Sequence, residues 1–104
     1  MDSVQVTDDQ SKAVQKTPNR VSLDSIKDKI AGTEYFHPDC LPSMTIAVVQ
    51  MNNGFVVLGK SAPADPENYD VELGQKFAGE DAIRQIWQLE GYLLREKLMN
   101  GHDA

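Results

Sequence analysis

The clearest hydrophobic pattern in this chain is a pair of short apolar segments on either side of an Asn-Gly dipeptide, within residues 44–61. This arrangement is a strong short-range signal for a β-hairpin, so we predict two antiparallel strands joined by a two-residue turn at Asn53 and Gly54. Strand alternation then puts apolar side chains on both faces. One face has Ala47, Val49, Met51, Val56 and Leu58, and the other has Met44, Ile46, Val48, Phe55 and Val57. Since a two-stranded sheet is marginal in water, both faces need cover.

A short helix is predicted before the hairpin. Ser22 is a suitable N-cap, and Val21 and Ile26 have the spacing of a hydrophobic staple around the first helical turn. Gly32 is the expected end of this helix. A helix of little more than two turns is stable only when it is docked on the rest of the domain.

A long helix is predicted over residues 71–99, and Gly91 is the expected position of a bend, because glycine weakens a helix interior. Its apolar residues cover more than one stripe of the helix surface, which is more than one hairpin can bury. Trp87 and Tyr92 share helical spacing with the leucines, so we expect both to pack in the core.

Together these elements predict an α+β fold with a short N-terminal helix, a two-stranded antiparallel hairpin and a long kinked C-terminal helix. We expect a disordered tail over residues 1–20, one domain over residues 21–100 and a short tail over residues 101–104. A domain of this size buries a modest share of its surface, so the uncovered apolar face and the surplus leucines favour a homo-oligomer.

Charge and cysteine content exclude several classes of function. The net charge is -6, and the first twenty residues hold three acids and three bases, which leaves thirteen acids against seven bases in the rest. DNA or RNA is therefore not an expected partner. The apolar runs are too short to cross a membrane, and a single cysteine without a signal-peptide pattern indicates a cytoplasmic protein.

Two motifs suggest chemistry, and both have simpler explanations. Residues 54–61 (GFVVLGKS) match the P-loop pattern, but strand formers fill the stretch that must curl around phosphate, so we interpret the match as accidental. His37 and Cys40, with Asp39, could ligate a metal or form a nucleophile and base. The set lacks a fourth metal ligand and a group to orient the imidazole, so we expect no metal, no cofactor and no catalytic residues.

The loop predicted over residues 33–43 is rich in aromatic and polar side chains. Tyr35 and Phe36 either plug the end of the helix layer or stack on a ligand, and Ser43 and Thr45 offer hydroxyl groups at the start of the first strand. The residues alone leave both interpretations open.

Three strings carry a resemblance to a known family: NGF followed by GKSA in residues 53–62, DPENYD in residues 65–70 and IWQLEGYLLRE in residues 86–96. Over about residues 19–98 the chain resembles a family of small proteins of tailed phages and prophages that includes the anti-CBASS cyclic-nucleotide sponge. The resemblance implies a non-enzymatic hexamer in the host bacterial cytoplasm. Such a hexamer would sequester cyclic dinucleotides and trinucleotides without cleaving them.

The resemblance also implies roles for particular side chains in pockets between subunits. Tyr35 would stack on a base, Lys27 or Lys29 would contact phosphate, and Ser43 or Thr45 would supply the hydroxyl. Arg84 on the long helix would serve a separate trinucleotide pocket. The alternative is an oligomeric phage accessory protein that binds a host protein and takes no small ligand.

Overall fold

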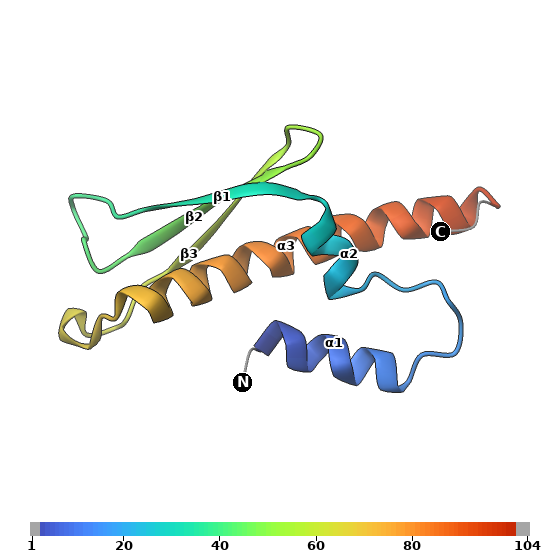
Figure 1. Ribbon diagram of the computed structural model, residues 1–104, viewed down its shortest axis with the longest axis horizontal. Helices are drawn as coiled ribbons and strands as arrows, with labels where there is room; N and C mark the ends of the chain where they lie inside the picture. Colours follow the sequence, from blue (N-terminus) through green and yellow to red (C-terminus); the bar gives the residue numbers. More distant parts are fainter. Residues whose placement is uncertain (1–2, 102–104) are drawn as a thin grey trace.

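The computed structural model describes residues 3–101 and has an α+β fold (Figure 1). A three-stranded antiparallel sheet with strand order β1-β2-β3 lies against one long helix. The elements, in chain order, are α1 (Ser3–Ala13), α2 (Leu23–Asp28), β1 (Ile30–Phe36), β2 (Thr45–Met51), β3 (Val56–Ser61), the 3-10 turn η1 (Pro66–Asn68) and α3 (Val71–Met99).

The expectation of a two-stranded sheet was wrong, because β1 is a third strand. The short helix α2 ends at Asp28, earlier than the predicted end at Gly32, and the chain then pairs with the free edge of β2 from Ile30↔Met51 to Phe36↔Ile46. The register shifts between Ile30 and Gly32, so a bulge begins the strand. β-Branched and aromatic residues in this segment favour an extended backbone over helix.

The predicted hairpin is present as β2 and β3, but its register differs by one residue. Met51 N–H donates to Phe55 O (2.7 Å) and Gly54 N–H donates to Met51 O (2.9 Å), with Gly54 at φ 89°. These bonds define a three-residue loop with a glycine bulge, one residue longer than the predicted turn. Because side chains alternate along a strand, this shift of one residue exchanges the inward-facing and outward-facing side chains of β3. Val57, not Val56 or Leu58, lies beside Val49 in the core.

The core lies between the sheet and α3. Its buried members are small or aliphatic side chains from α2, the hairpin and the long helix, namely Ile26, Ala47, Val49, Met51, Val57, Ala78, Ala82 and Ile86. Gly59 is the point of closest approach, because a Cβ there would lie 2.0 Å from Ala78 O. Glycine at this position allows the helix to rest directly on β3.

The long helix continues without interruption through Gly91, so the predicted kink is not found (Figure 1). Nothing lies within 4 Å of the position that a Cβ on Gly91 would occupy. Glycine retains its N–H and can stay in a helix at an energetic cost. Trp87 packs against the core as predicted and donates from Nε1 to Val21 O (3.0 Å). Tyr92 does not, since 69% of it is exposed.

A helix occupies much of the segment predicted to be a disordered tail. In α1, Val4 is buried, and Asp8 Oδ1 accepts hydrogen bonds from Arg20 Nη1 (2.7 Å) and Leu23 N–H (3.1 Å). Ser3 N–H donates to Glu80 Oε2 of α3 (3.1 Å). Polar contacts therefore hold α1 to the other helices. In the expected C-terminal tail, residues 102–104 lie outside the described residues.

One chain leaves much surface uncovered. Its accessible surface is 7241 Å² at a mass of 11.5 kDa, whereas a compact monomer of that mass exposes about 5,800 Å². The radius of gyration is 15.7 Å, against about 13 Å for a compact domain of this length. Among residues 3–101, no helix has the length and apolar character needed to cross a membrane.

Candidate functional site

The six candidate binding residues do not form one site within a subunit. Lys29 follows α2 beside the Ile30↔Met51 end of the sheet, whereas Thr45 begins β2 beside the Phe36↔Ile46 end. Six residue-to-residue steps along β1 separate these ends, which is about 20 Å at the usual rise per residue. The lysines and the hydroxyl groups of the same subunit are therefore too far apart to hold one phosphate.

The two candidate hydroxyl groups are close in sequence, and that of Thr45 lies against the start of α3. Ser43 and Thr45 are buried, and neither Ser43 Oγ nor Thr45 Oγ1 has a hydrogen-bond partner among the described residues. A Cβ on Gly74 would lie 2.6 Å from Thr45 Oγ1, so the helix backbone passes close to this oxygen. Leaving a buried hydroxyl unpaired costs about 1–3 kcal/mol. Among the side chains of residues 3–101, these two oxygens are the buried polar atoms that lack a hydrogen-bond partner.

Tyr35 and His37 lie at the same end of the sheet. Tyr35 is partly exposed, and its hydroxyl oxygen lies 3.7 Å from the position that a Cβ on Gly79 would take. His37 Nδ1 lies 3.0 Å from Met44 O and 3.3 Å from the Tyr69 hydroxyl, with the two rings edge to face. This end therefore combines two aromatic rings, an imidazole and two unpaired hydroxyl groups.

The basic candidates are in different surroundings. Lys27 is on the exposed side of α2, and Lys29 Nζ forms an ion pair with Glu90 Oε2 (2.7 Å). Arg84 of α3 donates from Nη2 to Ser3 Oγ of α1, so α1 occupies one side of this guanidinium. The structure thus brings Arg84 to α1 and Lys29 to Glu90 of α3.

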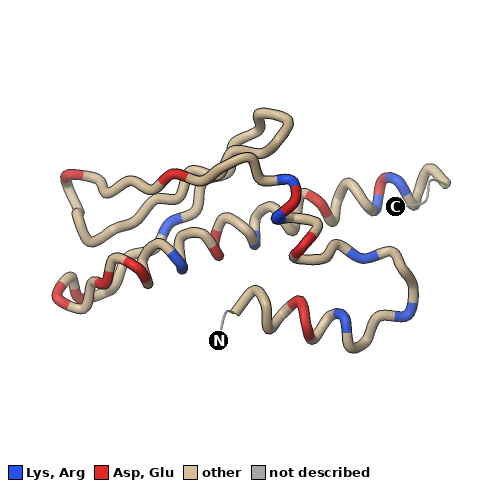
Figure 2. Tube along the Cα trace, in the orientation of Figure 1, with Lys and Arg blue, Asp and Glu red and all other residues tan. Residues whose placement is uncertain are grey.

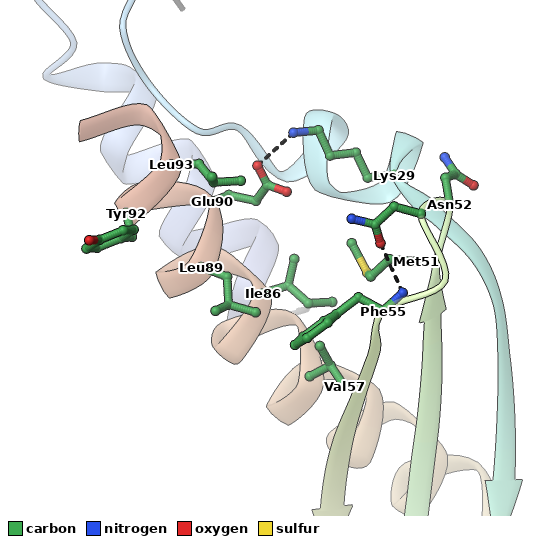
Figure 3. Close-up of a pocket in the computed structure, with 11 residues that line it drawn as sticks. Lys29, Met51, Asn52, Phe55, Val57, Ile86, Leu89, Glu90, Tyr92 and Leu93 are labelled. Atoms are coloured by element: carbon green, nitrogen blue, oxygen red, sulfur yellow. Dashed lines mark hydrogen bonds and ion pairs between the residues drawn. The ribbon is translucent and has the colours of Figure 1, made fainter. Parts of the chain in front are cut away.

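A cleft that the sequence analysis missed lies between the hairpin loop and the second half of α3 (Figure 3). Its volume is about 470 Å³, and Phe55, Leu89 and Leu93 provide much of its apolar wall. The Lys29–Glu90 ion pair closes one side. The spacing of Leu89 and Leu93 was a usable signal, but three separate segments of the chain build the cleft. Its lining fits an apolar or aromatic group better than a multiply charged ligand.

The two motifs noted in the sequence have ordinary structural roles. Residues 54–61 form the hairpin loop and β3, so they lack the strand–loop–helix geometry of a P-loop, and the prediction of an accidental match is confirmed. Cys40 is an exposed free thiol. Within residues 3–101, no three side chains of His, Cys, Asp or Glu are grouped so that they could hold a metal ion.

Among the carboxyl groups of residues 3–101, that of Asp8 has a shifted pKa. Burial alone would raise the pKa of Asp8, but the hydrogen bond from Arg20 and the one from the Leu23 N–H outweigh burial and lower it below its ordinary value. This carboxylate serves structure, because it caps the start of α2 and anchors α1.

Comparison with known proteins assigns a family and leaves the activity open. No curated protein and no solved structure matches the chain. A family model does match, over residues 21–98, which cover α2, the sheet and nearly all of α3. On the strength of that match the chain belongs to the phage protein family described as N4 Gp49/phage Sf6 gene 66.

Proposed function

We propose that this phage protein binds cyclic oligonucleotides and sequesters them intact, in pockets formed between subunits of a homo-oligomer. It would act in the host bacterial cytoplasm, and it would carry no cofactor and catalyse no reaction. Membership of the phage family over residues 21–98 supports this proposal, together with the resemblance of the chain to the anti-CBASS sponge.

The observation that carries the proposal is the pair of buried, unpaired hydroxyl groups of Ser43 and Thr45. A phosphate oxygen would supply the missing partner, and a hydrogen bond to a charged group is worth about 1.5–3 kcal/mol. Tyr35 lies on the neighbouring strand at the same end of the sheet, where its ring would stack on a base. The start of α3 has to shift for a ligand to reach both oxygens.

A shared pocket also accounts for the separation of the candidate residues. The two ends of the sheet are too far apart for one phosphate, but residues from different subunits can meet. The lysine of one subunit would then face the hydroxyl groups of another. In this proposal Lys27 and Lys29 contribute to the hydroxyl pocket of a neighbouring subunit, and Arg84 serves a separate trinucleotide pocket.

Isothermal titration of the full chain with a panel of cyclic dinucleotides and trinucleotides tests the proposal. We expect heat from at least one member at micromolar protein, and no heat from any member would refute it. Denaturing the loaded complex and chromatographing the released ligand separates a sponge from a nuclease. A sponge returns the intact cyclic nucleotide, whereas linear products would contradict a non-enzymatic role.

Variants localise the binding. Ser43→Ala combined with Thr45→Val removes both hydroxyl groups and should lower the affinity about tenfold or more. The matched control is Thr33→Val, which removes an exposed hydroxyl from β1 and should leave the affinity unchanged. Equal affinities in the hydroxyl variant and the control would show that the ligand binds elsewhere.

The apolar cleft favours a second candidate function, the binding of a host protein. Phe55 and Leu89 expose large apolar surfaces there, and such clefts accept apolar side chains of protein partners. An affinity pull-down from host lysate tests this candidate. A stoichiometric host protein that is lost in Leu89→Asp would support it, and capture that is unchanged in this variant would refute it.

A further inference from the structure

The face of the sheet opposite α3 is apolar and uncovered. We use the name outer face for the surface formed by Phe36 of β1, Ile46 and Val48 of β2, and Val56 and Leu58 of β3, which lie in neighbouring positions of the register. Phe36, Val56 and Leu58 are 52%, 47% and 55% exposed. In Figure 1 all three helices lie on the other side of the sheet.

We infer that this outer face is where two copies of the chain pack against each other. The inference rests on the homo-oligomer in the proposed function, but it does not depend on the ligand. One chain exposes about 1,400 Å² more than a compact monomer of its mass. This excess is summed over the whole chain, and it is larger than the area of about 800 Å² that a standard interface buries on each partner.

The outer edge of β3 is less suited than the outer face to contact with a second copy, because side chains of α3 already bond to its backbone. Lys60 N–H donates to Asp81 Oδ2 (2.9 Å), and Leu58 O accepts from Gln85 Nε2 (2.7 Å). These contacts satisfy backbone groups that an added strand would need. Contact through the face of the sheet leaves both bonds in place.

The charges on the strands fit a two-fold arrangement. Figure 2 shows few charged residues along the sheet; the three strands carry one acid, Glu34 on β1, and one base, Lys60 on β3, and both belong to the outward-facing set. Glu34 is in the row of Val48 and Leu58, and Lys60 is in the adjacent outward row with Phe36 and Ile46.

A two-fold axis parallel to β2 and passing over Val48 exchanges the positions of β1 and β3 between the copies. Glu34 of one copy then lies over β3 of the other, about 7 Å along the strand from the level of Lys60. A lysine side chain spans that distance. The same pair forms twice, as a two-fold interface requires, and the apolar residues meet between the two pairs. Aligned packing of two sheets is a common arrangement for such faces.

Sedimentation and light scattering of the full chain without ligand test the interface. We expect the wild type to have a mass that is an even multiple of 11.5 kDa. Leu58→Glu should halve that mass or reduce it to the single subunit. The matched control is Phe77→Glu, which puts the same charge at a similarly exposed position on α3 and should keep the wild-type mass. A monomeric wild type, a Leu58→Glu variant that keeps the wild-type mass, or an equal loss of mass in the control would overturn the inference.

A charge exchange guards against variants that simply misfold. Glu34→Lys alone places two lysines at each contact and should weaken the dimer at least tenfold, whereas Glu34→Lys with Lys60→Glu should restore it. Failure of the double variant to restore the dimer, with its circular dichroism unchanged, would overturn the proposed axis.

Crosslinking gives a second readout of the axis. In a Cys40→Ser background, Val48→Cys places one thiol of each copy under the axis, and a short bismaleimide should join the two chains. The same reagent should not join chains that carry Asn53→Cys, because this residue is in the hairpin loop away from the outer face. Equal yields from the two variants would contradict the arrangement.

These results separate the interface from the proposed function. An assembled wild type that Leu58→Glu does not dissociate overturns only the outer-face interface and leaves shared pockets open. Dissociation by Leu58→Glu in a protein that gives no heat with any cyclic nucleotide overturns only the ligand proposal.

Discussion

Gly59 offers the sharpest test of how α3 rests on the sheet. In Gly59→Ala, the new methyl group would lie 2.0 Å from Ala78 O and 2.6 Å from Ala82 N. Both are backbone atoms of the same helix, so no side-chain rotation relieves the contact. A normal contact needs more than 3 Å, so α3 has to move away from β3 by at least about 1 Å.

Such overpacking costs about 1–3 kcal/mol, because the displaced helix also loses contact with Ala47 and Val57. This is a large share of the total stability of a small domain, which is about 5–15 kcal/mol. Gly91→Ala is the matched control in the same fold. Its methyl group meets nothing within 4 Å, so it should stabilise the helix by about 1 kcal/mol.

Urea unfolding at one fixed protein concentration measures both variants, since the stability of an oligomer depends on concentration. We expect a lower midpoint for Gly59→Ala and a higher one for Gly91→Ala. If Gly59→Ala unfolds within about 0.5 kcal/mol of the wild type, the close packing of α3 on β3 described above is wrong.

Three further predictions concern polar groups. The folded pKa of Asp8 lies below its unfolded value of about 3.8, so its stabilising contribution is complete only well above that value and is lost as the pH falls through the folded pKa. Acid titrations of unfolding should show this loss, and Asp8→Asn should lack it. At neutral pH, Asp8→Asn should cost about 2 kcal/mol, through the weakened bond to Arg20. Thr45→Val replaces an unpaired buried hydroxyl by a methyl group, so thermal denaturation without ligand should show about 1 kcal/mol of added stability, and a loss would show that the hydroxyl has a partner. Lys29→Gln removes an ion pair with Glu90 in which the lysine is half exposed, and it should change the unfolding free energy by less than about 1 kcal/mol in urea; a larger loss would mean that the pair holds α2 in place.

The parts of the fold that depend on local patterns were predictable. The N-cap of α2, the hairpin and the extent of α3 follow from residues that are neighbours in the chain, such as Ser22 and the Asn53-Gly54 pair. Strand β1 was missed because its residues are mostly exposed and do not alternate in polarity. It is a strand because the free edge of β2 needs hydrogen-bond partners, which is a property of the assembled sheet.

Helix α1 was missed for a similar reason, because its contacts join residues that are far apart in the chain. Few of its residues are apolar, and Asp8 is a polar residue that becomes buried only because Arg20 and the start of α2 satisfy it. Such a contact leaves no periodic signal in the sequence. The position of Thr45 at the start of a strand was predicted correctly, whereas Lys29 was expected inside the short helix and lies just after its end. The separation of the two residues follows from β1, which was not foreseen.

The hairpin loop has a consequence for how members of this family can diverge. The three-residue loop, with its left-handed backbone at Gly54, determines which side chains of β3 face the core and which face the solvent. If the same loop took the two-residue turn at Asn53 and Gly54, Asn52 would pair with Phe55, and Val57 would exchange with its neighbours Val56 and Leu58 between core and solvent. A substitution in this loop that favours the shorter turn would therefore change which apolar side chains β3 offers to the solvent, without altering any residue of the strand itself.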